Sequence, residues 1–323
     1  MEKKITVVIP TYKRPELLSR CLRALEEQEF DKSDFDVIVV SDGPDKYTRQ
    51  LACSWKYASL IEVKYLPLPQ KGGPAAARNA GWRASDAPII AFTDDDTIPD
   101  PNWLQSIWQA WKGERAAVYT GRVVVPIKGR PTDYEWNTAQ LEKADFVTAN
   151  CACTRQALEM VNGFDESFKT AWREDSDLEF RLLQQNIPIY HLQNAIVLHP
   201  ARKARWGISV GEQRKNIFNA LLYKKFPKLY RERIQRRPAW NYYLMICFFL
   251  LGAFFAFDGA YTASAVLFGA WLLMIGLFAG KRLKHTSHTA SHILEMIVTS
   301  AAIPFAATYW SLYGAWRYKV LYL

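Results

Sequence analysis

Two long apolar runs toward the C-terminal end constrain the fold of this chain more than any other feature. Residues 239–257 and 260–279 are each close to the roughly 20 apolar residues that a helix needs to cross a bilayer. Asp258 and Gly259 form a tight turn between them. A hairpin buried inside a soluble protein is the alternative, but such helices rarely stay apolar on every face. The sequence therefore predicts a transmembrane helical hairpin.

Basic residues flank this hairpin on both sides, with "RERIQRR" before it and "KRLKH" after it. The positive-inside rule places both outer ends on the cytoplasmic side, so we expect a multi-pass protein of the cell inner (cytoplasmic) membrane with its other parts in the cytoplasm. A third apolar segment, residues 293–316, has Glu295 near its start and Pro304 in its middle. The sequence leaves open whether this segment spans the membrane, re-enters it or lies in the interface.

The formal net charge of +9 is concentrated in one segment. Residues 201–237 hold twelve Lys or Arg against two Glu, which accounts for the whole excess. We expect residues 201–238 to form a basic, amphipathic, membrane-proximal segment with a helix around 211–223. Because this charge lies beside apolar helices, it favours anionic lipid headgroups and argues against nucleic acid as a partner. The five cysteines lack the spacing of a zinc site or a disulfide framework, as expected in a reducing compartment.

Residues 5–198 alternate short β-branched runs with amphipathic helical segments. The runs "ITVVIP", "FDVIVVSD", "LIEVKYLPL" and "APIIAFTDDD" are predicted strands, and residues 16–28 and 74–85 are predicted helices. Strands that are apolar on both faces are typical of a parallel sheet covered by helices. We therefore expect an α/β sandwich over residues 1–200, with residues 116–155 richer in β-structure. The polar motifs "TYKR", "SDGPD" and "TDDD" should converge at the carboxyl ends of the strands.

The aspartates of "TDDD" are candidates for holding a cation that also binds phosphate oxygens. Neither a P-loop pattern nor a dinucleotide-binding glycine pattern follows the first strand. Asp94 and Asp96 offer hard oxygen ligands, which suit Mg²⁺ or Mn²⁺. Taken alone, three consecutive aspartates are also consistent with a solvated turn.

The other motifs that accompany this one in the sequence indicate a protein family. The segments "VVIPTYKRPELLSRCLRAL", "VIVVSDGPD", "GGPAAARNAGWRAS", "IIAFTDDDTIPDPNWL" and "NGFDESF…REDSDLEFRL" occur in that order, and together they resemble the family 2 glycosyltransferases of the GT-A fold over residues 5–230. The resemblance implies a nucleotide-sugar-binding sandwich with a mostly parallel central sheet. It implies a metal-dependent, inverting transfer of a sugar from a nucleotide-diphosphate sugar, UDP being favoured over GDP, to a saccharide or lipid-linked saccharide acceptor.

The resemblance also carries roles over to individual positions. For Asp42 a simple turn is the alternative to a nucleotide contact, and for Arg78 a surface cation is the alternative. Asp95 matches a ribose-facing or variable position, with a solvated neighbour as its other interpretation. The residues implied in nucleotide binding are Pro10, Thr11, Tyr12, Arg14, Asp42, Arg78, Asp94 and Asp95.

For the metal, the resemblance implies Asp96 as direct ligand, with Asp94 and His199 beside it. A structural role is the alternative for His199. The catalytic base is implied in the acidic pair Glu174 and Asp175, with Asp175 preferred; capping of the helix that they open is the alternative.

Around this pair, Asp177 and Arg181 are expected to form an ion pair on the helix surface. Trp172 could stack on a sugar or pack in the core. Arg205 and Trp206 are further candidates for acceptor or sugar binding.

One departure argues against processive synthesis. The polymerising relatives carry Q-x-x-R-W, whereas this chain has "RKARW", with Arg202 in the place of Gln. With two confident spans as well, we expect single transfer. Two alternatives stay open: a polyprenyl-phosphate glycosyltransferase, and a membrane-tethered sugar-nucleotide or glycan binder without turnover. A nucleotidyltransferase would normally have a glycine-rich phosphate loop after the first strand, where this chain has "PTYKRPE". The sequence specifies neither the donor sugar nor the acceptor, and a homo-oligomer is left open.

Overall fold

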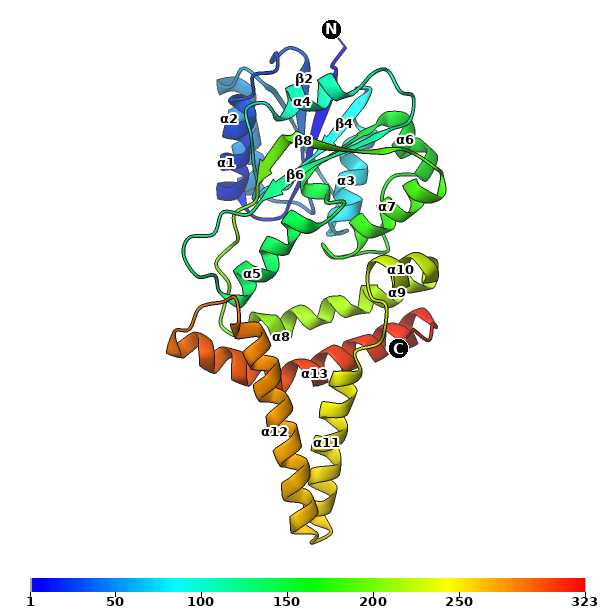
Figure 1. Ribbon diagram of the computed structural model, residues 1–323. Coiled ribbons are helices and arrows are strands. Elements are labelled where there is room, and N and C mark those ends of the chain that lie inside the picture. Colours follow the sequence, from blue (N-terminus) through cyan, green and yellow to red (C-terminus); the bar gives the residue numbers. More distant parts are fainter. Residues whose placement is uncertain (1, 323) are drawn as a thin grey trace. The chain divides into compact units, whose positions relative to one another are not determined.

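The computed structural model describes residues 2–322, which form two compact units (Figure 1). The first, called here the sheet unit, comprises the chain up to Pro126 together with Ala139–Pro200. The second, called the helical unit, comprises Ile127–Thr138 and the chain from Ala201 onward. The chain therefore passes between the units three times, because a short internal segment belongs with the C-terminal part.

One mixed sheet forms the middle of the sheet unit, with its eight strands in the order β3-β2-β1-β4-β7-β6-β8-β5. Strands β1 to β4 run parallel, and β6 and β8 share their direction because β7 is antiparallel to both β4 and β6. The carboxyl ends of these six strands therefore lie at one edge. The strands are β1 (Ile5–Thr11), β2 (Phe35–Ser41), β3 (Glu62–Pro67), β4 (Ile89–Phe92), β5 (Ile98–Pro99), β6 (Val118–Val124), β7 (Cys151–Thr154) and β8 (Ile189–Leu198).

Helices cover both faces of this sheet (Figure 1). On β1, Val7 and Ile9 pack under one helical layer, while Val8 packs under the other, as the two-residue repeat of a strand requires. The first layer has α1 (Pro15–Glu26), α2 (Lys46–Ala58) and α4 (Trp103–Ala110); the second has α3 (Pro74–Arg83), α6 (Arg155–Val161) and α7 (Glu174–Gln184). The mostly parallel α/β sandwich expected from the sequence is confirmed.

The expectation of a β-rich stretch over residues 116–155 is only partly right. Strands β6 and β7 bound it, but α5 (Asp133–Ala139) and two short 3₁₀ helices, Gln140–Lys143 and Thr148–Asn150, lie between them. The start of α5 has a physical cause. The Glu135 carboxylate accepts a bond from the Thr132 backbone N–H at 2.7 Å, and the Thr132 hydroxyl accepts one from the Glu135 N–H at 3.3 Å. This reciprocal capping box satisfies amides that a helix start leaves without partners.

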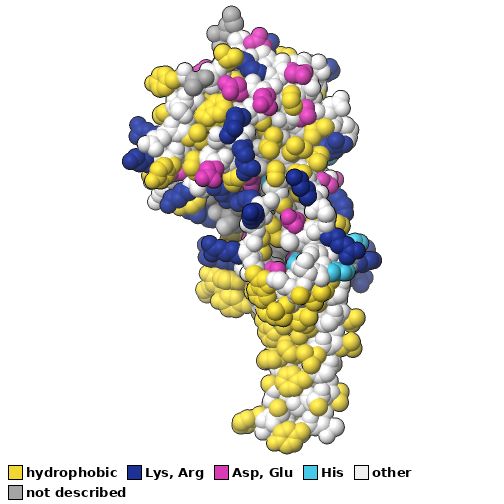
Figure 2. Space-filling model, turned by 90° about the vertical axis from the view of Figure 1, so that its left-hand side faces the viewer, with side chains coloured by type: hydrophobic (Ala, Val, Ile, Leu, Met, Phe, Trp, Pro, Cys, Tyr) yellow, Lys and Arg dark blue, Asp and Glu magenta, His cyan; other side chains and the backbone are white. Residues whose placement is uncertain are grey.

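The helical unit contains three helices that are long and apolar enough to cross a membrane, among the residues described. They are α11 (Trp240–Phe257), α12 (Tyr261–Leu283) and α13 (Ala290–Tyr318). α11 and α12 form a hairpin that turns at Gly259, whose φ of +83° suits glycine. Figure 2 shows hydrophobic side chains over the surface of this hairpin. These side chains lack protein partners on their outer sides, as expected for a surface that meets lipid.

The basic segment folds into a series of short helices in the same unit. These are α8 (Ile208–Glu212), the 3₁₀ helix Gln213–Asn216, α9 (Ile217–Lys225) and α10 (Pro227–Arg233). The helix expected around residues 211–223 therefore exists, but it begins earlier and contains a 3₁₀ segment in its middle. Helix α13 packs against this series of helices, and it continues as one helix through Pro304.

Candidate active site

The polar motifs gather at the edge where the parallel strands end. Thr11 ends β1, Asp42 follows β2, and Asp94 and Asp96 follow β4. Because β8 runs parallel to β6 and in the same direction as β4, His199 follows β8 at this same edge. The convergence predicted from the sequence is confirmed by the topology.

The three consecutive aspartates have different surroundings. Asp95 is only 2% exposed and accepts hydrogen bonds from the Thr11 hydroxyl at 2.7 Å and from Arg14 Nη1 at 3.1 Å. Burial raises the pKa of Asp95 to about 6, with Arg14 opposing the shift and the charge of Asp96 adding to it. Asp95 is therefore not the solvated neighbour considered above, since it ties the turn after β4 to the loop after β1.

Threonines fix the backbone of the same turn. The Thr97 hydroxyl donates to the Asp94 backbone carbonyl at 2.7 Å and lies 2.7 Å from the Thr93 hydroxyl. The side chains of Thr93 and Thr97 are both buried. This bonding excludes the interpretation of the acidic run as a solvated turn. It fixes the backbone of the turn that carries Asp94 and Asp96.

Asp94, Asp96 and His199 form a cluster with the composition of a metal site. One ligand atom from each lies within 4.8 Å of the others, and His199 Nε2 is 3.6 Å from an Asp96 oxygen. Burial would raise the pKa of Asp94, but the charges of Arg78 and His199 hold it below its ordinary value. Two carboxylates and one imidazole suit a divalent cation such as Mn²⁺, and Mg²⁺ also accepts carboxylate oxygens.

Arg78 connects this cluster to the acidic pair. Its guanidinium is 2% exposed and reaches Asp94 at 2.8 Å with one nitrogen and Glu174 at 3.1 Å with another. The interpretation of Arg78 as a surface cation is therefore wrong. A buried guanidinium needs carboxylate partners to offset its desolvation, and α3 places it between two of them.

The acidic pair opens α7, directly after Arg173 in a left-handed conformation with φ of +74°. Glu174 is 3% exposed, and burial raises its pKa to about 7, with the charge of Asp175 adding to the shift and Arg78 opposing it. Asp175 is half-buried and accepts the Ser176 N–H at 2.7 Å. The two carboxylates therefore differ: Glu174 is enclosed and paired, whereas Asp175 is accessible.

Further along the helix, the expected ion pair between Asp177 and Arg181 is present, with an N–O distance of 2.7 Å. Its expected location on the helix surface is wrong, because the Asp177 side chain is fully buried. The guanidinium of Arg181 also donates to the Gly163 carbonyl at 2.6 Å. This pair therefore joins α7 to the chain after α6.

Asp42 organises a loop that sequence reasoning did not connect to it. Its carboxylate accepts the backbone N–H groups of Gly72 at 2.6 Å and Gly73 at 2.9 Å, so the local turn considered for it is not its role. Gly73 has φ of +94°, and an added Cβ would lie 2.7 Å from the Lys169 carbonyl oxygen. The "KGGP" letters were the available signal, since consecutive glycines mark close backbone approach.

The remaining candidates have plainer surroundings. Pro10 lies near the end of β1 and Tyr12 directly after it, and both are half-buried. The Lys71 amino group lies 4.2 Å from the centre of the Tyr12 ring. Trp172 is half-buried, with the Arg173 guanidinium 4.6 Å from its ring centre. Arg205 and Trp206 belong to the helical unit, where both are exposed.

Comparison with known proteins identifies the family. The model of glycosyl transferase family 2 matches residues 6–258, and the chain belongs to this family. Validoxylamine A glucosyltransferase of Streptomyces hygroscopicus subsp. limoneus is 28% identical over 254 residues, which cover 67% of this chain and 53% of that protein.

Other relatives support the same assignment. The poly(ribitol-phosphate) β-N-acetylglucosaminyltransferase TarP of Staphylococcus aureus is 22% identical, over 70% of this chain and 76% of its own length. The chain spans about half the length of the first curated relatives that it matches. Among solved structures, mannosyltransferase PcManGT from Pyrobaculum calidifontis, in complex with GDP-Man and Mn²⁺, shares the fold with a TM-score of 0.59 and 15% identity, covering 97% of this chain and 88% of that one.

Proposed function

We propose that this protein is a metal-dependent, inverting glycosyltransferase that moves one sugar from a nucleotide-diphosphate sugar to a saccharide or lipid-linked saccharide at the cytoplasmic membrane face. The observation that carries the proposal is a continuous set of contacts. The Asp94, Asp96 and His199 cluster is joined through Arg78 to the acidic pair that opens α7. Binding of the diphosphate and removal of a proton can therefore take place in one site.

The cluster supports the donor side of the reaction. Asp96, Asp94 and the Nε2 atom of His199 would hold the cation, and a divalent cation neutralises the charge that develops on a departing diphosphate. Thr11, Asp42 and Arg14 lie at the same sheet edge, where the nucleotide would bind. Solved proteins of this fold have been described with GDP-Man and Mn²⁺ and with UDP, so the fold accepts either base. We favour UDP for this chain.

The acidic pair supports the acceptor side. Inversion requires the acceptor oxygen to bond to the anomeric carbon as the bond from that carbon to the diphosphate oxygen breaks, while a base takes the hydroxyl proton. Asp175 is the better base because its carboxylate is accessible, whereas Glu174 is buried and paired with Arg78. Glu174 would act through Arg78, as a group that positions the site.

The helical unit supports a membrane location. Its apolar hairpin and the basic segment before it suit an acceptor carried in the membrane. The same features are compatible with polyprenyl phosphate as acceptor, so a polyprenyl-phosphate glycosyltransferase is the second candidate. A transfer assay with both acceptor types separates the two functions.

The base assignment is tested with matched variants. Asp175→Asn should abolish transfer while nucleotide-sugar binding is kept, because the amide retains the shape but cannot take a proton. Glu174→Gln is the control for a neighbouring acid and should retain measurable transfer. Full activity of Asp175→Asn, with released nucleotide diphosphate as readout, would show that the base lies elsewhere.

The metal assignment is tested by calorimetry on the full chain in detergent. Asp96→Ala should remove the Mn²⁺-dependent part of UDP binding, because it deletes a ligand of the cation. A panel of nucleotide sugars with Mn²⁺ then identifies the donor. Unchanged binding of UDP by Asp96→Ala in the presence of Mn²⁺ would contradict this role.

A further inference from the structure

Helix α13 is accompanied by the basic segment over most of its length. Near its start, the Glu295 carboxylate accepts the Gly207 N–H at 2.7 Å. Further along, the Arg214 guanidinium lies 5.6 Å from the centre of the Trp310 ring. At Gly314, an added Cβ would be 2.9 Å from the Ile217 carbonyl oxygen. The order of these contacts shows that α13 and the helices from α8 to α9 run side by side in the same direction.

The accompanying segment is too charged to enter hydrocarbon. Between Gly207 and Arg233 it carries two acidic and seven basic side chains, spread from α8 through α10. Placing a charged side chain in the bilayer core is energetically unfavourable, and charged side chains within membrane-spanning segments rarely face lipid. Because α13 lies against this segment, α13 cannot cross the core without taking these charges along.

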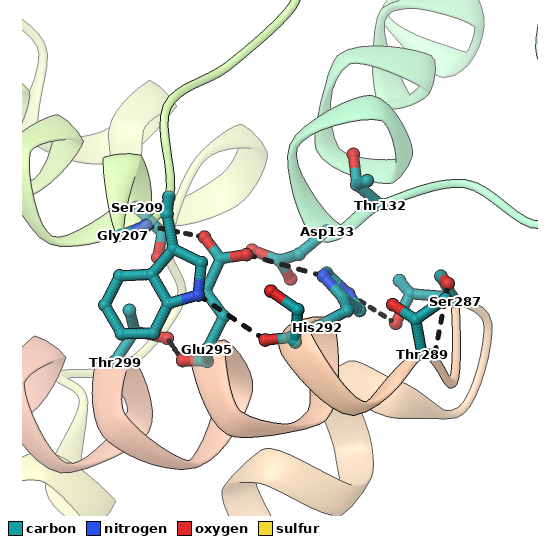
Figure 3. A network of polar contacts seen from close by, with 12 residues as sticks. Thr132, Asp133, Gly207, Ser209, Ser287, Thr289, His292, Glu295 and Thr299 are labelled. Carbon is teal, nitrogen blue, oxygen red and sulfur yellow. Dashed lines mark hydrogen bonds and ion pairs between the residues drawn. The ribbon is translucent and has the colours of Figure 1, made fainter.

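The first turns of α13 are held by a polar network at the end of α12, and Figure 3 shows its part around His292, Glu295 and Thr299. Arg282 forms a buried ion pair with Asp133 at 2.8 Å and donates to the Thr299 hydroxyl at 2.7 Å and to Ser209 at 3.0 Å. His292 lies 3.5 Å from Glu295 in the same network. Arg282 belongs to the basic end of the hairpin, so this network places the start of α13 at the level where α12 leaves the membrane.

The two faces of α13 differ in the way an interfacial helix requires. One face, which includes Thr299, Ser300 and Gly314, is buried against the rest of the unit. The other is apolar and exposed, with Leu294 at 56%, Leu312 at 50% and Trp316 at 76% of their full accessible surface. Its middle touches the hairpin through Phe305, whose ring centre is 5.3 Å from that of Phe249 in α11. The exposed face therefore continues the apolar surface of the hairpin.

We propose that α13 does not span the membrane but lies along its surface, with its exposed apolar face in the boundary between headgroups and acyl chains of the same bilayer that the hairpin crosses. An amphipathic helix with basic residues beside it and aromatic residues on its apolar face suits this depth. The chain then crosses the membrane twice, and α13 ends on the same side as the basic ends of the hairpin. The third apolar segment, which the sequence left undecided, is interfacial.

The number of crossings is tested by labelling single cysteines in the full chain. Exposed Cys53 and Cys247 are first replaced by Ser. Asp258→Cys marks the hairpin turn, and Leu321→Cys, at a side chain that is 85% exposed, marks the end after α13. A membrane-impermeant maleimide, applied to sealed vesicles of either orientation, should label the two positions from opposite sides. Labelling of both from the same side, whichever side it is, overturns the proposal.

The depth of α13 is tested by spin labels at Leu294, Ala301 and Leu312, which share one helix face to within about 20°. A helix along the surface should give the three labels the same shallow depth, measured from their relative exposure to oxygen and to a polar nickel complex. A spanning helix would place the label at position 301 roughly 10 Å deeper than the one at 294, because each residue rises about 1.5 Å. Neither measurement depends on transfer activity, so each result is separate from the proposed function.

Discussion

Replacing Arg78 with Met should destabilise the sheet unit more than any substitution on its surface. The guanidinium is 2% exposed and pairs with Asp94 at 2.8 Å and with Glu174 at 3.1 Å. Removing one partner of a buried ion pair costs roughly 3–5 kcal/mol of unfolding free energy, because the other charge stays buried without compensation. For a unit of this size, a loss of about 3 kcal/mol lowers the melting temperature by roughly 6–12 °C.

The pH dependence of this loss follows from the raised pKa of Glu174. Burial already brings that pKa to about 7, and without Arg78 it should rise further. A carboxyl group whose pKa is raised in the folded state stabilises the fold at low pH and loses this effect as pH rises through that pKa. The deficit of Arg78→Met relative to the unchanged protein should therefore be larger at a pH of about 8 than at about 5.5.

The assay is thermal unfolding of the full chain in detergent, followed by circular dichroism. Arg83→Met is the matched control, since Arg83 lies on the same helix and forms an exposed ion pair of 3.6 Å with Glu166. Its loss should change the unfolding free energy by no more than about 0.5 kcal/mol. The double variant Arg78→Met with Glu174→Gln should regain part of the stability. A shift below about 2 °C for Arg78→Met would refute the reasoning.

Two further substitutions examine the packing and the metal cluster. Gly81→Ala should destabilise the sheet unit by roughly 1–3 kcal/mol, because the added Cβ would lie 2.4 Å from Val8 Cγ1. Gly276→Ala is the control, since its added Cβ would meet no atom within 4 Å. Equal melting temperatures for the two variants would contradict the close packing at Gly81. His199→Ala should weaken Mn²⁺ binding in the presence of UDP by at least roughly tenfold, while His191→Ala, at an exposed position on β8, should not. Calorimetry measures both affinities, and equal values would exclude His199 from the metal site.

The backbone of the sheet unit was predictable because its signals are local. β1, β2 and β4 are short runs that are apolar on both faces, so the two-residue repeat and the burial follow directly from the letters. The polar residues after them were predictable as a group for a topological reason, since parallel strands end at one edge. The same reason brought His199 to Asp96, although the two residues are far apart in the chain.

The contacts between side chains were not predictable in the same way. Arg78 faces inward because α3 packs closely on β1 at Gly81, and nothing in the letters around Arg78 distinguishes this from a surface position. The link from Asp42 to Gly72 and Gly73 depends on how the loop after β3 folds back. The start of α5 is different: Thr132 and Glu135 have the spacing of a capping box, so this helix could have been predicted.

The segment Ile127–Thr138 has a practical consequence for any attempt to produce the sheet unit by itself. The residues that contact this segment come from far along the chain. Asp133 forms an ion pair with Arg282, and the Pro131 carbonyl accepts a hydrogen bond from the Ser287 N–H at 2.7 Å. A fragment that stops at Pro200 would keep the segment Ile127–Thr138 but lack the residues it packs against. The carboxylate of Asp133, which is buried beside Arg282, would then be exposed to solvent together with apolar groups of the same segment. Producing the sheet unit by itself therefore requires two edits, a stop after the last strand and a short replacement loop between Pro126 and Ala139.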